Sequence, residues 1–217
     1  MSTLPNLEEL DVDGAIREAA SKVGGDTRAT FLRKAGIGAG TVVGGSAILG
    51  ALPAIASAGV AKSDVAILNF ALTLEYLEAA FYAEALKSNF AGKVGDFAKV
   101  VAKHEAAHVA FLKSALGSAA VKSPKFDFKG TTADQAKFMA TAQVLEDTGV
   151  AAYLGQAGNI KSKKILGAAG SVLAVEARHA GWIRDLNNVS GAPAAFQGAA
   201  TKAQVLAAVK KTGFIVG

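Results

Sequence analysis

The strongest constraint on this chain is an internal repeat that returns four polar residues at the same spacing. When the sequence is shifted by 71 residues, eight residues align in pairs: Glu75 with Glu146, Tyr82 with Tyr153, Glu105 with Glu176, and His108 with His179. In each half, a glutamate lies 30 residues before a Glu-x-x-His motif. The repeat predicts two similar structural units, each with a Glu…Tyr segment followed by a Glu-x-x-His segment.

The apolar residues recur at helical spacing. The chain has only four prolines and 51% hydrophobic residues, which favours packed helices and argues against wholesale disorder. Four long periodic runs and a short fifth lie at about 63–86, 97–116, 132–158, 162–188 and 201–211. We find no sustained alternation of apolar and polar residues, so we expect an all-α fold.

Two polar patterns mark predicted helix starts, and the loop lengths indicate how the helices are connected. Ser63-Asp64 is expected to cap the first helix, and Thr132 with Gln135 forms a capping-box pattern at the start of the third. The loop at 117–131 can reach about 50 Å when extended, which is enough to return the chain along a bundle. We therefore predict a four-helix bundle of two helical hairpins joined by a long crossover.

Helical geometry places the repeated residues on common faces. Seven residues rotate a helix by about 700°, so Glu75 and Tyr82 share a face two turns apart. Glu105 and His108, three residues apart, are neighbours on one face. The surroundings of the first glutamate are apolar, and a carboxylate there is costly unless it is paired or binds a metal. Four carboxylates and two imidazoles that converge would suit two divalent cations, either iron or manganese, and they also accept zinc.

Several short segments extend this pattern to a known family. The residues at 68–72, 75–78, 151–155 and 176–179, within a stretch of about 63–186, resemble the bacterial ferritin-like domain family, to which desiccation-related proteins are related. The resemblance implies a ferritin-like bundle in which two helices each give a Glu and two others each give Glu-x-x-His. It also implies six metal ligands: Glu75, Glu105, His108, Glu146, Glu176 and His179.

The family resemblance further implies a function. The expected cofactor is a pair of iron ions, with manganese or zinc as substitutes, and the expected partners are metal ions and O2 or peroxide. We expect ferroxidase-like or peroxidase-like oxidoreductase chemistry in which Fe(II) is oxidised. Tyr82 and Tyr153 are candidates to donate an electron or quench radicals, to hydrogen-bond the ligand carboxylates, or to serve only as core aromatics.

Two alternatives remain open at this point. His104-Glu105-x-x-His108 has the form of a zinc metallopeptidase motif, although the repeat places Val175 opposite His104. We expect His104 to be an ordinary histidine near the site or a proton carrier beside it. The other alternative is a metal-free structural protein of stress or desiccation. Glu78 lies one turn from Glu75 but repeats as a glycine, so we expect it at the surface or beside the ligands.

The first sixty residues carry features of an export segment. Residues 35–61 contain no charge, and this stretch exceeds the about 20 apolar residues needed to cross a membrane. The Ala-Ser-Ala sequence at 56–58 fits a small-residue cleavage site. Residues 27–33 resemble a twin-arginine signal with Ala29 where the second arginine belongs. We expect export to the periplasm, cell envelope or exterior, or a membrane anchor through 35–61.

These observations divide the chain into three predicted parts: an export signal or anchor at 1–58, the bundle at 59–190, and a tail with a short helix at 191–217. The absence of cysteine excludes disulfides, thiolate zinc sites and cysteine nucleophiles. The net charge of +5 comes from scattered basic residues, so no nucleic-acid partner is expected. A membrane contact is expected only through the N-terminal part, and a homo-oligomer stays open.

Overall fold

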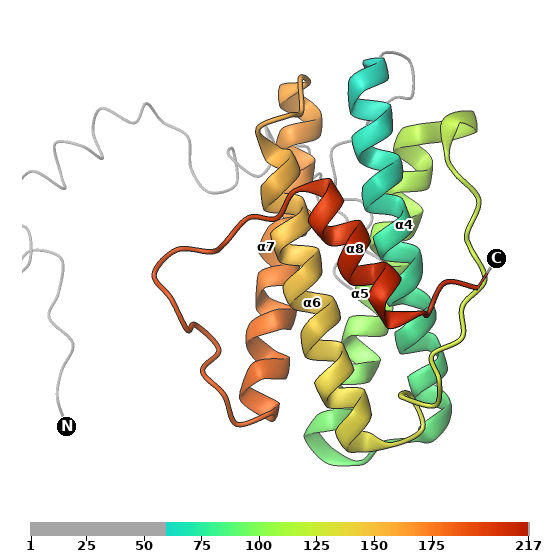
Figure 1. The fold of residues 1–217 in the computed structure, drawn as a ribbon, viewed down its shortest axis with the longest axis vertical. Helices are drawn as coiled ribbons and strands as arrows, with labels where there is room; N and C mark the ends of the chain where they lie inside the picture. The colour runs from blue at the N-terminus through green and yellow to red at the C-terminus, as the bar shows by residue number, and fades with distance from the viewer. Residues whose placement is uncertain (1–59, 217) are drawn as a thin grey trace, which may run out of the picture. The chain divides into compact units, whose positions relative to one another are not determined.

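The computed structural model describes residues 60–216, which form a bundle of four long helices and a fifth, shorter one (Figure 1). Within this part of the chain, five α-helices and two 3-10 turns follow one another: α4 Lys62–Ala85, η2 Leu86–Ser88, α5 Gly92–Leu116, η3 Gly117–Ala119, α6 Gln135–Ala157, α7 Lys163–Leu186 and α8 Lys202–Thr212. The predicted all-α bundle is confirmed.

The long helices pair as two antiparallel hairpins. Helix α4 packs mainly on α5 and α6 packs mainly on α7, while α4–α6 and α5–α7 contacts join the hairpins. A long crossover, 120–134, connects them, as the loop length predicted. The crossover is fastened to the end of the chain, because the Asp127 N–H donates to the Phe214 carbonyl and the Val216 N–H donates to the Lys125 carbonyl.

Two predicted helix caps were wrong. The N-cap of α6 is Asp134, whose side chain accepts the Lys137 N–H. The Thr132 hydroxyl instead donates to Glu84 at 2.5 Å, which ties the crossover to α4. Helix α4 begins after Ala61 without a side-chain cap.

The Asp64 carboxylate does not cap its own helix either. It is fully buried and accepts the backbone N–H groups of Lys161 and Ser162, 2.9 Å each, at the start of α7. The sequence pattern was right that Asp64 accepts backbone N–H groups, but these groups belong to a distant segment.

Helix α5 begins five residues earlier than expected. The glycines at 92 and 95 weaken the helical pattern, but the first turn still forms. A Cβ on Gly95 would lie 1.9 Å from the Phe90 carbonyl oxygen, so only glycine allows this segment to fold back so closely. The short fifth helix was predicted well: Thr201 and Gln204 form a capping box, and Val205 and Val209 of α8 pack into the core.

Two apolar clusters occupy the interior of the bundle, with a polar layer between them. On α5, Phe97 and Val101 belong to one cluster, and Phe111 and Leu112 belong to the other. On α7, Ile183 and Ile165 divide in the same way. The Glu-x-x-His motifs of both helices fall in the gap, so the layers above and below shield them from water.

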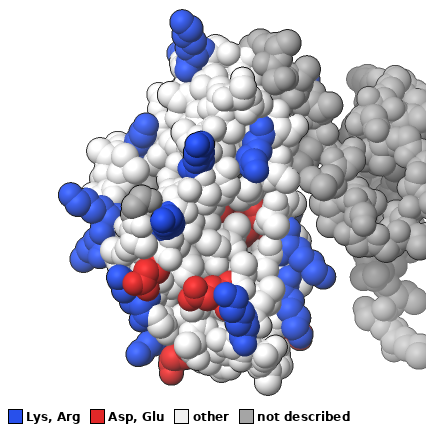
Figure 2. All heavy atoms as spheres, turned by 90° about the vertical axis from the view of Figure 1, so that its right-hand side faces the viewer, with Lys and Arg blue, Asp and Glu red and all other residues white. Residues whose placement is uncertain are grey.

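Within the described residues, one helical segment, Lys62–Ser88, is long and apolar enough to cross a membrane, and 56% of its most apolar window is buried inside the bundle. A core helix of a bundle meets the same length and composition criteria, so this is weak evidence for a span. The predicted export segment and its cleavage site lie outside the described residues. On the face drawn in Figure 2, Lys and Arg side chains lie mostly scattered among uncharged atoms.

Candidate metal centre

All six predicted ligands meet in the polar layer between the apolar clusters. Helix α4 contributes Glu75 and α6 contributes Glu146, while α5 and α7 contribute one Glu-x-x-His motif each. The four glutamates are completely buried, and the exposed fractions of His108 and His179 are 8% and 2%. The helical spacing therefore turned every one of these side chains toward the centre.

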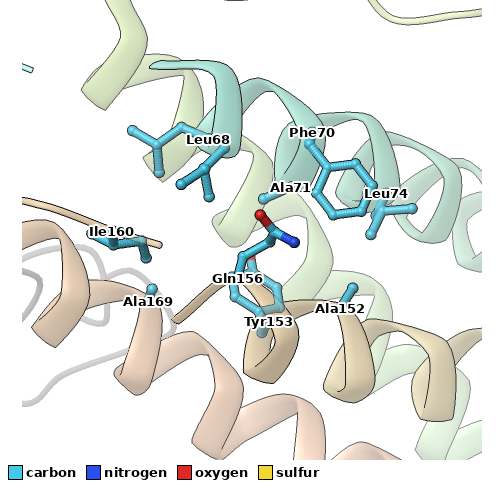
Figure 3. A pocket seen from close by; sticks show the side chains of 10 residues that line it. Leu68, Phe70, Ala71, Leu74, Ala152, Tyr153, Gln156, Ile160 and Ala169 are labelled. Carbon is cyan, nitrogen blue, oxygen red and sulfur yellow. The ribbon is translucent and has the colours of Figure 1, made fainter. Parts of the chain in front are cut away.

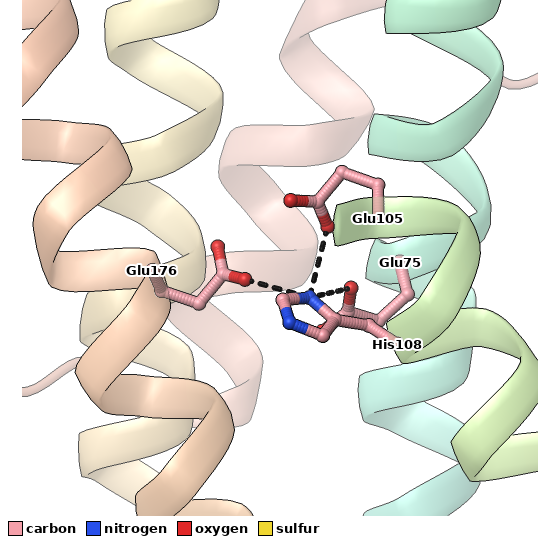
Figure 4. A group of neighbouring side chains, drawn as sticks. All are labelled: Glu75, Glu105, His108 and Glu176. Atoms are coloured by element: carbon pink, nitrogen blue, oxygen red, sulfur yellow. Dashed lines mark hydrogen bonds and ion pairs between the residues drawn. The ribbon is translucent and has the colours of Figure 1, made fainter. Parts of the chain in front are cut away.

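The first group of donors surrounds the His108 ring (Figure 4). Its Nδ1 atom lies 3.0 Å from Glu176 Oε1, 3.2 Å from Glu75 Oε2 and 3.3 Å from Glu105 Oε2. These four side chains come from α4, α5 and α7 and offer ligand atoms within 4.8 Å of one another. One metal ion would fit among them.

The second group repeats the first around His179. Its Nδ1 atom lies 3.2 Å from Glu105 Oε1, 3.3 Å from Glu146 Oε2 and 4.0 Å from Glu176 Oε1. These four donors also lie within 4.8 Å of one another. Glu105 and Glu176 belong to both groups, so each presents a carboxylate to two neighbouring positions.

Several of the donor atoms have no hydrogen-bond partner in the protein. This observation bears on whether the residues fit a cation. Six buried atoms accept or donate no hydrogen bond among the described residues: Glu75 Oε2, Glu105 Oε1, Glu146 Oε2, both carboxylate oxygens of Glu176, and His179 Nδ1. These atoms lie close to other charged donors of the centre, but the contacts do not have the geometry of hydrogen bonds. Buried polar atoms are normally satisfied, and carboxylate and imidazole donors suit a divalent metal. The residues present therefore fit metal ions.

Burial and neighbouring charges displace the pKa values of several groups in the centre. Burial and the nearby Glu75 carboxylate raise the pKa of Glu105 to about 7. Burial, with Glu105 and Glu75, raises the pKa of Glu176 well above its usual range. Burial lowers the pKa of His179, but contact with Glu105 and Glu146 outweighs it and raises that pKa to about 10. A bound divalent cation would instead favour the ionised form of these carboxylates.

Two tyrosines connect the hairpins across this layer. The Tyr82 hydroxyl of α4 donates to Glu146 Oε1 of α6, and the Tyr153 hydroxyl of α6 donates to Glu75 Oε1 of α4, both at 2.5 Å. Each tyrosine thus orients the glutamate of the opposite hairpin and leaves its second carboxylate oxygen directed at a histidine. Several roles were considered for Tyr82 and Tyr153, and the observed geometry supports one of them, the hydrogen bond to a candidate ligand.

Glu78 is buried beside the centre. It is only 3% exposed, so of the two expected positions the one beside the ligands is found and the one at the surface is not, and neither donor group includes it. A Cβ on its repeat partner Gly149 would lie 3.2 Å from Glu78 Oε1 and 3.5 Å from Glu176 Oε2. The missing side chain at Gly149 therefore provides the space for this carboxylate. Burial, followed by the Glu176 and Glu146 carboxylates, raises the pKa of Glu78 well above its usual range.

His104 contacts the centre from its edge. Its Nδ1 atom lies 2.8 Å from the Nε2 atom of His179, and it belongs to neither donor group. Sequence spacing alone could not find this contact, because it joins α5 to α7 across the bundle. The sequence had marked His104 in two ways, because it completes a His-Glu-x-x-His motif and interrupts the repeat, and its expected position near the site is found.

The fold and the donor set define a helical-bundle protein whose core carries buried carboxylates and histidines close enough together to hold metal. Residues 63–189, more than half of the chain, match the model of the ferritin-like domain family, and the chain belongs to this family. No protein with a curated description matches it.

Proposed function

We propose that this protein binds two metal ions, most readily iron, and acts as an oxidoreductase that oxidises Fe(II) with O2 or peroxide. The observation that carries the proposal is the pair of buried donor groups that share Glu105 and Glu176. Glu105 and Glu176 would help to hold both ions, while Glu75 with His108 and Glu146 with His179 would each help to hold one. Four glutamate charges also balance two divalent cations in a layer that excludes water.

The chain's residues have separate roles in this proposal. His108 and His179 each serve one position, and Glu75 and Glu146 each complete one. The two tyrosine hydroxyls hold those outer glutamates in place. Each outer glutamate is hydrogen-bonded by a tyrosine at one oxygen only, so its other oxygen would be available to a metal ion. Two bound iron ions would supply the electrons that reduce O2 or peroxide.

A crevice between α4 and α6 supports access by a small apolar oxidant. Its lining is almost entirely apolar, with Leu68, Ala71 and Leu74 on one side and Ala152 on the other (Figure 3). Tyr153 also lines the crevice, and its hydroxyl binds Glu75 of the centre. The crevice therefore ends one side chain away from a candidate ligand.

Metal analysis tests the proposal directly. Protein purified without chelator, then loaded anaerobically with Fe(II), should contain two ions per chain, and its near-ultraviolet absorbance should rise when O2 or peroxide is added. The double variant Glu105→Ala with Glu176→Ala should bind neither ion, because these residues belong to both groups. A folded wild-type protein that binds no metal would refute the proposal.

The same measurement separates the two alternatives. A zinc peptidase would hold one zinc through His104 and His108, yet neither donor group contains His104. A metal-free structural protein would bind no ion at all. The six unpartnered donor atoms favour the two-ion centre over both.

We also propose that the protein is exported, on the strength of the uncharged stretch at 35–61 and the Ala-Ser-Ala sequence at 56–58. N-terminal sequencing of the protein recovered outside the cytoplasm should find a start near residue 59. Recovery of the uncleaved chain in the membrane fraction would favour an anchor, and recovery in the cytoplasm would refute export.

A further inference from the structure

The two candidate metal positions are not supported equally, because the repeat is broken beside one of them. His104 lies one turn before His108 on α5, and its repeat partner on α7 is Val175. Both side chains are partly buried at matching places on their helices. Both donor groups contain the same types of residue. The difference between His104 and Val175 therefore concerns neighbours of the candidate ligands and not the ligands themselves.

Of the two candidate ligand histidines, only His179 makes a hydrogen bond with His104. His179 directs Nδ1 at Glu105 and Glu146, which leaves Nε2 for His104 Nδ1 at 2.8 Å. The two rings are inclined by 18° and their centroids lie 5.1 Å apart, well beyond the 2.8 Å between the nitrogens, so the contact runs from ring edge to ring edge. Within the described residues, the Nε2 atom of His108 has no hydrogen-bond partner.

This contact has a consequence for metal binding. A neutral imidazole that ligates through Nδ1 carries its hydrogen on Nε2, so His179 would donate that hydrogen to His104 Nδ1. The bond fixes both the tautomer and the orientation of the ring, with the lone pair of Nδ1 already directed into the centre. Loss of such a partner typically weakens metal affinity by about 10–100-fold.

We propose that His104 is a positioning residue that makes the His179 position the tighter of the two metal sites, so that the ions bind in order. The inference rests on the proposed function, since it requires that both positions bind metal. Glu105 and Glu176 are shared and cannot favour either position by their presence alone. The tyrosine bonds to Glu146 and Glu75 are repeated in both halves, whereas the bond from His104 is not, so among the hydrogen bonds to the donor groups this one can set the order of binding.

The test is an anaerobic titration of the full chain with Co2+, followed by calorimetry and by visible absorption of the bound ion. Wild-type protein should take up two ions in separate steps. His104→Val, which installs the residue of the other repeat, should weaken the tighter step about 10–100-fold and leave the other within about twofold. His104→Asn, whose amide oxygen can accept the same hydrogen bond, should recover most of the lost affinity.

The reciprocal variant moves the support to the other half. Val175→His should strengthen the weaker step, and the double variant with His104→Val should reverse which imidazole is bound first, as histidine NMR with Zn2+ would report. Two equal steps in the wild type, or an unchanged titration in folded His104→Val, would overturn the inference and leave the metal centre intact. Absence of any Co2+ binding by the wild type would instead refute the proposed function.

Discussion

Replacing Glu105 with glutamine should stabilise the metal-free protein and destabilise the metal-loaded one. In the folded chain the Glu105 pKa is about 7, against an ordinary value of 4.5. The unfolded chain therefore releases this proton first, and stability falls as pH rises from about 4.5 to 7. At 1.36 kcal/mol per unit, the loss reaches about 3 kcal/mol above pH 7. Glutamine keeps the shape and removes this loss.

The assay is urea denaturation of chelator-treated protein at pH 8 and at pH 4.5. Glu105→Gln should exceed the wild type by up to about 3 kcal/mol at pH 8, which corresponds to roughly 2–4 °C in Tm per kcal/mol, and the difference should vanish near pH 4.5. Asp96→Asn, which changes an exposed acid on the same helix, should leave stability nearly unchanged.

Bound metal should make the wild type more stable than the Glu105→Gln variant. At a free metal concentration one hundred times Kd, each occupied site adds about 2.7 kcal/mol to wild-type stability. Glu105→Gln lacks a donor common to both groups and should gain much less. If the variant is less stable than the wild type at pH 8 without metal, then the buried carboxylate is not the source of strain, and the reasoning fails.

Three further substitutions test other parts of the structure. Asp64→Ala removes the acceptor of two backbone N–H groups at the start of α7 and should cost about 2–3 kcal/mol of unfolding free energy, measured in urea. Tyr82→Phe removes the hydrogen bond to Glu146 and should weaken the affinity for one Co2+ ion about tenfold, while unchanged Fe(II) oxidation kinetics would remove a redox role for the tyrosine. Gly149→Ala places a Cβ 3.2 Å from Glu78 Oε1 and should cost about 1–3 kcal/mol, and a thermal melt that does not shift would contradict that packing.

The sequence predicted the centre because helical periodicity converts spacing into direction. Glu105 and His108, three residues apart, had to share a face, and the 71-residue repeat required a second copy of that face. An apolar setting then made a metal the simplest explanation for the buried carboxylates. Local rules were enough for these residues, since their positions depend on one helix at a time.

The tertiary structure decided which groups the predicted capping residues bond and which residues lie beside the centre. Thr132 and Asp64 both match local capping patterns, yet each bonds a segment far away in the chain. Competing partners appear only when the hairpins come together, and sequence patterns contain no information about them.

The sequence by itself determined the helices, the hairpin repeat and the inward set of glutamates and histidines, because each follows from a 3.6-residue period and from the cost of burying charge. Only the tertiary structure decided that Glu78 fills the space above Gly149 and that His104 reaches His179. Both contacts join residues of different helices, so they depend on how the hairpins pack. The spacing of residues within one helix does not predict that packing.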